Sequence, residues 1–296
     1  MGEGEISFAP SQKQEKIMQK NNNQSQVAES RWPLSLVVMG LIGGASLVFL
    51  LLGKNSSAPF LCGAWGSRFS GPATSLQLEA ILHYATSTVV PQQSRGEISV
   101  TFDVLRSSGP ADFLVFGLGR DSLMWASLNP RGRTLFLEED PKWVQTVLKD
   151  APALRAHTVR YRNQLSQADD LMHHFRSEPH CSPNKSFLRG NHKCRLALNM
   201  LANEVYDTEW DLIMIDAPRG YFPEAPGRMA AIYSAAVMAR NRKKAGVTHV
   251  FLHDVDRRVE KMYAEAFLCK KNRVKAEGRL WHFEIPPAAN INSDFC

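Results

Sequence analysis

Short polar clusters follow four strand-like apolar runs, and they carry residue types that bind cofactors and move protons. The apolar runs end at or beside Gly117, Glu138, Asp216 and His253. Ligands of open parallel sheets bind outside the carboxyl ends of the strands, so these positions should meet at one edge of the sheet. The sequence therefore predicts a single functional site at that edge.

The first two clusters fit an adenosine-containing cofactor. Gly117 and Gly119 let backbone N–H groups approach a ligand, although so short a pattern also fits a plain turn. Glu138 follows Gly117 by 21 residues, and a carboxylate there can accept hydrogen bonds from ribose hydroxyls, with Glu139 beside it. The alternative is a pair of solvated acids at a helix start. A dinucleotide usually requires a third glycine where Ser122 stands, so S-adenosylmethionine is favoured over a nicotinamide dinucleotide.

The two later clusters fit proton transfer. Asp216, His253 and Asp254 bring two carboxylates and an imidazole to neighbouring strand ends, and we expect one of them to act as a general base. Asp216 and Asp254 are also candidates for holding a divalent metal ion. A histidine at a strand end is equally common as a structural residue.

The loop after Asp216 fits recognition of an anionic sugar. Arg219 and Arg228 can clamp a carboxylate through paired hydrogen bonds, and Tyr221 can stack on a sugar ring. The alternative for Arg219 is a solvated loop cation. If Arg219 is the clamp, its replacement by alanine should lower turnover and leave cofactor affinity nearly intact.

Alternating strand-like and helical segments must position these residues. Helical periodicity covers Ser75 to Ala85, and the later segments alternate in the way that is typical of an α/β fold with a mostly parallel sheet. Glu277-Gly278 predicts a turn before a closing antiparallel hairpin. The expected strands are Phe113 to Phe116, Thr134 to Leu137, His157 to Tyr161, Trp210 to Ile215, Thr248 to Leu252 and Leu280 to Ile285.

Composition and charge limit the class of protein. The chain has 296 residues and a formal net charge of +6 without long Lys/Arg blocks, so no nucleic-acid partner is expected. Residues 33–52 carry no charge and are long enough to cross a bilayer as one helix. Basic residues are more numerous before this span than after it, which predicts a cytosolic amino terminus. We therefore expect a cytosolic tail (1–31), a transmembrane anchor (32–53), a stem (54–74) and a lumenal domain (75–296).

A lumenal domain would allow disulfide bonds. Cys181 and Cys194 flank one polar loop and are the most plausible pair among the five cysteines. Two free thiols are the alternative, because sequence alone does not give their distance.

Long motifs, read in order, resemble one plant Golgi family. Phe113-Leu-Val-Phe-Gly-Leu-Gly119, Trp210-Asp-Leu-Ile-Met-Ile-Asp-Ala-Pro218 and Val250-Phe-Leu-His-Asp254 are similar to motifs of the glucuronoxylan and arabinogalactan glucuronic acid 4-O-methyltransferases. The resemblance covers roughly residues 75–296 and is stronger to the arabinogalactan branch. It implies a Rossmann-like, S-adenosylmethionine-dependent methyltransferase fold, with cofactor contacts at Gly117, Gly119, Glu138 and Asp216.

The resemblance also implies an activity and a location. We expect 4-O-methylation of glucuronic acid on arabinogalactan glycans, by a single-pass type II Golgi membrane protein whose catalytic domain is lumenal. The alternatives are a glucuronoxylan 4-O-methyltransferase and a non-catalytic Golgi scaffold of glycan synthesis. Similarity to metal-dependent small-molecule O-methyltransferases suggests a metal ion between Asp216 and Asp254.

Overall fold

The computed structural model describes residues 72–183, 187–288 and 294–296. The expected cytosolic tail and transmembrane anchor, and the stem up to residue 71, lie outside these residues. Within the described ranges, no helix is long and apolar enough to cross a membrane.

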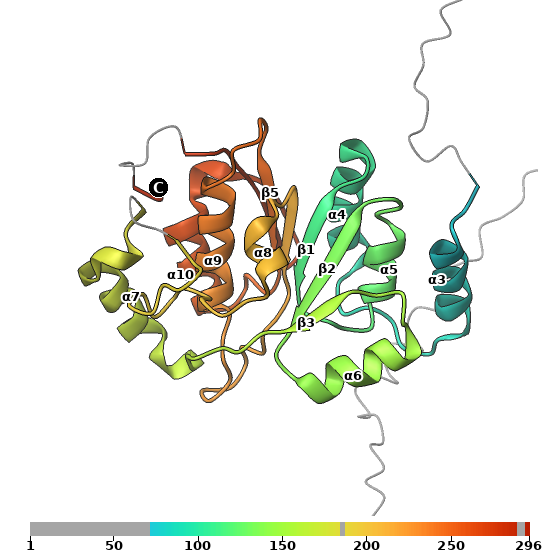
Figure 1. Cartoon of the computed structure of the whole chain (residues 1–296), viewed down its shortest axis with the longest axis horizontal. Helices are drawn as coiled ribbons and strands as arrows, with labels where there is room; N and C mark the ends of the chain where they lie inside the picture. Colours follow the sequence, from blue (N-terminus) through green and yellow to red (C-terminus); the bar gives the residue numbers. More distant parts are fainter. Residues whose placement is uncertain (1–71, 184–186, 289–293) are drawn as a thin grey trace, which may run out of the picture. The chain divides into compact units, whose positions relative to one another are not determined.

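The centre of the domain is a seven-stranded sheet in the order β3-β2-β1-β4-β5-β7-β6 (Figure 1). β1 to β5 run parallel, whereas β7 lies antiparallel to β5 and β6 antiparallel to β7. This is the Rossmann-like methyltransferase fold with the closing hairpin that the sequence predicts. The strands are β1 (Asp112–Phe116), β2 (Arg133–Glu138), β3 (Ala156–Thr158), β4 (Leu212–Ile215), β5 (Thr248–Leu252), β6 (Arg273–Glu277) and β7 (Leu280–Ile285).

Helices cover both faces of the sheet (Figure 1). The first turn of α6 forms as predicted, because the Asp140 side chain accepts the Lys142 N–H at 2.9 Å and Pro141 opens the helix. The helices are α3 (Ser75–Thr86), α4 (Arg95–Ser108), α5 (Ser122–Ser127), α6 (Pro141–Asp150), α7 (Ala168–Ser177), α8 (Asn203–Asp207), α9 (Met229–Arg240) and α10 (Arg258–Tyr263), which continues as a π-helical segment (Ala264–Leu268).

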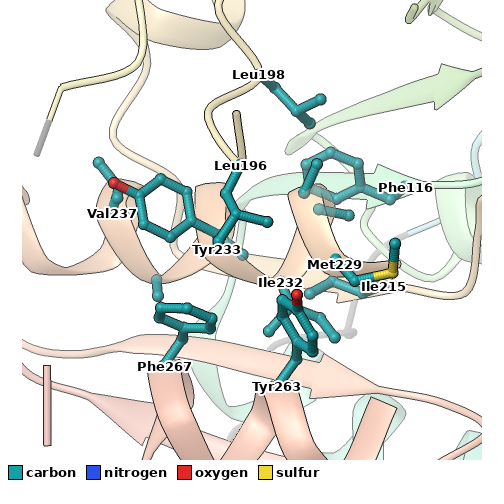
Figure 2. Packing of buried hydrophobic residues seen from close by; sticks show 14 of the residues in the cluster. Phe116, Leu196, Leu198, Ile215, Met229, Ile232, Tyr233, Val237, Tyr263 and Phe267 are labelled. Carbon is teal, nitrogen blue, oxygen red and sulfur yellow. The ribbon is translucent and has the colours of Figure 1, made fainter. Parts of the chain in front are cut away.

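Two apolar cores form because alternate strand residues point to opposite faces of the sheet. Phe116 and Ile215 lie on the face covered by α7, α9 and α10, where they pack with residues of α9 such as Ile232 and Tyr233 (Figure 2). Phe113, Val115 and their neighbours lie on the other face, under α4, α5 and α6. Apolar cores therefore pack against both faces of the sheet and support the strand ends at its carboxyl edge.

Two disulfide bonds are present in the described residues. Cys181–Cys194 confirms the pairing predicted from the sequence. Cys269–Cys296 was not predicted; it attaches the last residue of the chain to the segment after α10. Phe295 is buried beside it, against Phe267.

Candidate active site

The turn after β1 brings backbone N–H groups close to the end of β2. Gly117 has φ of 126°, and a Cβ there would lie 3.1 Å from the Ala217 side chain, so a residue without a side chain is required. The turn continues as the Gly119 N–H donates to Ser122 Oγ at 2.8 Å. The two glycines therefore shape a tight turn at the predicted edge of the sheet.

Glu138 is fixed by that turn. Its Oε2 accepts the Leu118 N–H and its Oε1 accepts the Asp140 N–H, both at 3.1 Å. Burial raises the pKa of Glu138, and these two backbone hydrogen bonds oppose the rise. Each carboxylate oxygen has a second lone pair, so the side chain can still accept hydrogen bonds from a ligand.

Glu139 turns toward the β4 loop. Its Oε1 accepts from Arg219 Nε at 2.8 Å, while its Oε2 is buried without a hydrogen-bond partner among the described residues. A cavity of about 520 Å³ lies beside this pair, next to the half-buried Tyr161, whose buried hydroxyl also lacks a described partner. Burial and the charges of the two glutamates raise the pKa of Tyr161. Glu138 and Glu139 thus have different surroundings.

Asp216 and His253 form a hydrogen-bonded pair at the ends of β4 and β5. His253 Nδ1 lies 2.9 Å from Asp216 Oδ1, and His253 is fully buried. Burial alone would raise the pKa of Asp216, but the His253 hydrogen bond and the charge of Arg228 outweigh it and hold that pKa far below its usual range. Asp216 is therefore an ionised group that is a weak proton acceptor.

Asp254 is bound by three guanidinium groups. Its Oδ2 lies 2.8 Å from Arg228 Nη2 and 2.9 Å from Arg257 Nη2, and its Oδ1 accepts from Arg279 Nη1 at 2.7 Å. Asp254 also adopts φ of 60°, a left-handed conformation that non-glycine residues rarely take. At the end of β5, one carboxylate therefore binds three arginine side chains.

Arg228 is part of this cluster and is not a free cation. It donates to the carbonyl oxygens of His253, at 2.7 Å, and of Pro218 and Asp216, besides contacting both aspartates. Only 5% of its side chain is exposed. This arrangement favours a positioning role over contact with substrate.

The remaining predicted substrate residues lie further out. Arg219 is 55% exposed and paired with Glu139, and Tyr221 is exposed with its ring against Phe222. Neither contacts Asp216 or His253 in the described structure. The structure therefore unites Asp216, His253, Asp254 and Arg228, and groups Arg219 with Glu139 instead.

Four residues of this site were not predicted: Gln93, Glu97, Arg279 and Arg257, the last of which contacts Asp254 as described above. Gln93 Nε2 donates to Asp216 Oδ2 at 3.1 Å, Glu97 Oε1 lies 3.6 Å from His253 Nε2, and Arg279 contacts Asp254. Gln93 lies just before α4 and Glu97 lies in its first turn. The capping box of Ser94 and Glu97 is a sequence pattern from which the start of this helix could have been predicted. Arg279 follows the hairpin turn and has no comparable signal.

Comparisons with known proteins identify related sequences. The sequence profile of the IRX15/IRX15L/GXM family matches residues 96–283. Arabinogalactan O-methyltransferase 1 of Arabidopsis thaliana is 63% identical over 270 residues, covering 88% of this chain and 93% of the relative. Glucuronoxylan 4-O-methyltransferase 1 of the same plant is 48% identical over 227 residues, covering 74% of this chain and 78% of the relative.

Among solved structures, a methyltransferase-like protein from Silicibacter pomeroyi aligns with a TM-score of 0.38 and 16% identity, covering 67% of this chain and 89% of that one. The family profile spans more than half of this sequence, including the ends of β1, β2, β4 and β5. The chain belongs to the IRX15/IRX15L/GXM family.

Proposed function

We propose that this protein methylates the 4-hydroxyl of glucuronic acid residues on arabinogalactan glycans, with S-adenosylmethionine as the methyl donor. The observation that carries the proposal is the 63% identity to arabinogalactan O-methyltransferase 1 over 88% of this chain. The strand-end site supports it independently, because a glycine turn, a fixed carboxylate and an Asp–His pair meet at one edge. Glucuronoxylan is the second candidate acceptor, on the basis of 48% identity to glucuronoxylan 4-O-methyltransferase 1.

The residues at the β1 and β2 ends fit this cofactor. Glu138 offers fixed carboxylate oxygens to two ribose hydroxyls, and the turn of Gly117 and Gly119 leaves room for the chain that bears the methyl group. S-adenosylmethionine, when bound, supplies a methyl group on a positively charged sulfur that an oxygen nucleophile can displace in line. The protein must then align the acceptor hydroxyl, remove its proton and exclude water.

His253 is the best candidate for the general base. Asp216 Oδ1 accepts the proton of His253 Nδ1, so Nε2 keeps a lone pair, and Nε2 has no hydrogen-bond partner within the described chain. The proton of the acceptor hydroxyl would pass to Nε2, and the neighbouring carboxylates would stabilise the imidazolium that forms. Asp216 then orients the imidazole, and Asp254 holds the surrounding arginines.

The aspartates do not fit a divalent metal ion. Oxygen atoms of Asp216 and Asp254 lie within 4.8 Å of a His253 nitrogen and of one another, as a metal site would require. However, Arg228, Arg257 and Arg279 already surround them, and a doubly charged ion would be repelled by these three cations. We therefore assign no step to a metal ion.

The predicted location is part of this proposal. Residues 33–52 would anchor the protein as a single-pass type II membrane protein of the Golgi, with residues 75–296 in the lumen. The Cys181–Cys194 and Cys269–Cys296 bonds support an oxidising compartment. Protease protection of the domain in sealed Golgi vesicles would test the orientation.

Transfer of a labelled methyl group tests the activity. The full-length protein in its membranes would be incubated with labelled S-adenosylmethionine and either arabinogalactan or glucuronoxylan. We expect label on O4 of glucuronic acid released from arabinogalactan. Label only on xylan would favour the second acceptor, and cofactor binding without transfer to either glycan would favour the scaffold alternative.

A further inference from the structure

A second cavity is lined by residues that contact the strand-end cluster. It has a volume of about 850 Å³, within the size range of small-ligand pockets. Its walls come from the start of α4 and from the turn between β6 and β7. These two segments approach closely, since a Cβ at Gly278 would lie 2.7 Å from Glu97 Oε1.

Three residues of the cavity wall connect it to the strand-end cluster. They are Gln93, Glu97 and Arg279. Each contacts a different member of the cluster, because Gln93 binds Asp216, Glu97 faces His253, and Arg279 binds Asp254. One layer of side chains therefore lies between a molecule in this cavity and the strand-end cluster.

Two buried polar atoms in this region lack hydrogen-bond partners in the described structure. They are Gln93 Oε1, on a residue that lines the cavity, and His253 Nε2, which Glu97 faces, on side chains of which at most 4% is exposed. A buried acceptor without a hydrogen bond is unfavourable by about 1–3 kcal/mol, so Gln93 Oε1 indicates a ligand that donates to it. Hydroxyl groups of a sugar would supply the missing hydrogen bonds.

The charges of the lining favour an anionic ligand. Arg95 and Arg279 line the cavity, and Glu97 is the one acid among its lining residues. The backbone N–H groups of Ser94 and Arg279 already bind Glu97, and these hydrogen bonds outweigh the effect of its burial and lower its pKa. Arg279 is 43% exposed and donates to Asp254 through Nη1 alone, so within the described chain its other N–H groups are free for a ligand.

We propose that this cavity binds the glucuronic acid acceptor and that Arg279 binds its carboxylate. The inference rests on the proposed function for the identity of the acceptor. In glucuronic acid the carboxylate is attached to C5, next to the C4 that carries the hydroxyl. A site that methylates O4 must therefore hold a cation near its base, and Asp254 anchors Arg279 beside His253 in this way.

The cation first expected to bind the carboxylate lies on the other side of the site. Arg219 borders the cavity of about 520 Å³ near Glu139, and its guanidinium is already paired there. That cavity is lined by Glu139, which follows the proposed ribose ligand Glu138 in the chain, and so we assign it to the cofactor side. The two cavities would thus hold the two substrates, with Gln93 and Glu97 connecting the acceptor cavity to Asp216 and His253.

Replacement of Arg279 tests this assignment in the full-length protein. We would measure methyl transfer to an arabinogalactan oligosaccharide that ends in glucuronic acid, and to the same oligosaccharide with its carboxyl group reduced to an alcohol. In Arg279→Met the preference for the acid should fall about 30-fold or more, while S-adenosylmethionine affinity stays within about twofold. Arg279→Lys should recover part of the preference, since an ammonium group cannot form the paired contact.

Arg258→Met is the matched control, because Arg258 is an exposed arginine paired only with Asp169 among the described residues. An unchanged preference in Arg279→Met, or an equal loss in Arg258→Met, would overturn the assignment. Loss of preference in Arg219→Met instead would move the carboxylate site to the β4 loop. Should Arg279→Met fail to fold, Arg279→Lys carries the same test.

A binding measurement separates this inference from the proposed function. The wild-type protein and Arg279→Met would be titrated with the acidic oligosaccharide in the presence of S-adenosylhomocysteine. Binding that depends on Arg279 without any turnover would refute the methyltransferase and keep the site. Turnover that does not depend on Arg279 would keep the enzyme and refute the site.

Discussion

On the β1–β2 side of the carboxyl edge Glu138 is held by two backbone N–H groups, whereas on the β4–β5 side Asp254 is held by three guanidinium groups. The first arrangement needs only a short turn and the start of the next helix. The second needs side chains from segments that are distant in the sequence, such as Arg228 and Arg279. The cofactor side is therefore built locally, and the acceptor side depends on the completed tertiary structure.

This difference has consequences for substitution. Removal of one side chain from a buried charge cluster leaves the other charges without compensation, which is strongly destabilising. Removal of the Glu138 carboxylate leaves neutral backbone donors without a partner and no uncompensated charge, which is less destabilising. Functional loss on the acceptor side should therefore often accompany loss of stability, whereas on the cofactor side the two should separate.

The largest expected effect is a loss of turnover after removal of the proposed base on the acceptor side. His253→Ala removes the proposed base, so turnover should fall by about 10²- to 10⁴-fold while S-adenosylmethionine affinity is retained. Single-turnover assays and calorimetric titration would measure the two quantities. His249→Ala is the control, because His249 lies near the other end of β5 and contacts His282. A comparable loss in both variants would show that His253 has only a structural role.

The next effect concerns the cofactor side. Glu138→Ala should weaken S-adenosylmethionine binding by about ten- to a hundredfold, because two charge-assisted hydrogen bonds to the ribose are lost. Glu139→Ala should change this affinity much less, since Glu139 binds Arg219. Isothermal titration of both variants gives the comparison, and equal or reversed losses would mean that the ribose ligand is assigned to the wrong residue.

A smaller effect concerns the pKa of Asp121 and its contribution to stability. Burial, and then the charge of Asp216, raises the pKa of Asp121 to about 6, above the value of about 3.9 for an unfolded chain. The folded state therefore binds more protons between these values, and this group lowers stability as pH rises through that window. Asp121→Asn should stabilise the protein by about 1–3 kcal/mol above pH 6.

Urea unfolding at pH 7.5 and at pH 4 would measure this change. The gain should vanish at pH 4, where the native carboxyl is protonated. Asp103→Asn, an exposed aspartate on α4, should change the free energy of unfolding by less than about 0.5 kcal/mol at either pH. A gain that is the same at both pH values would exclude ionisation of Asp121 as the cause.

The smallest expected effect concerns metal ions. Because three guanidinium groups already compensate the aspartates, dialysis against a chelator should leave methyl transfer within about twofold. Added Mg²⁺ or Mn²⁺ should be equally without effect. Complete loss of activity that one of these ions restores would mean that the arginines rearrange around a metal ion.

Much of the cofactor side could be predicted from the sequence because its signals are local. The apolar run before Gly117, the acidic end of β2 and the Asp140 cap each lie within a few residues of the feature that they specify. The parallel direction of β1 to β5 follows from the alternation of strands and helices, but their order in the sheet was not predicted. The bounds were less accurate, since β3 is Ala156–Thr158 whereas the predicted strand is His157 to Tyr161.

The acceptor side was only partly predictable because it joins distant segments. The pair of Asp216 and His253 follows from adjacent parallel strands, but Gln93 is 123 residues from its partner Asp216. Nothing near Asp254 in the sequence indicates that it holds Arg279, which is on the hairpin. The proposed base and its neighbours at the strand ends could be predicted from the sequence, whereas the residues that line the acceptor cavity could not.

The attachment of Phe295 and Cys296 has a consequence for truncation of the protein. Phe295 is part of the core, and Cys296 is bonded to Cys269, so these two residues are structural. A truncation that removed both would leave the aromatic cluster around Phe267 open to water.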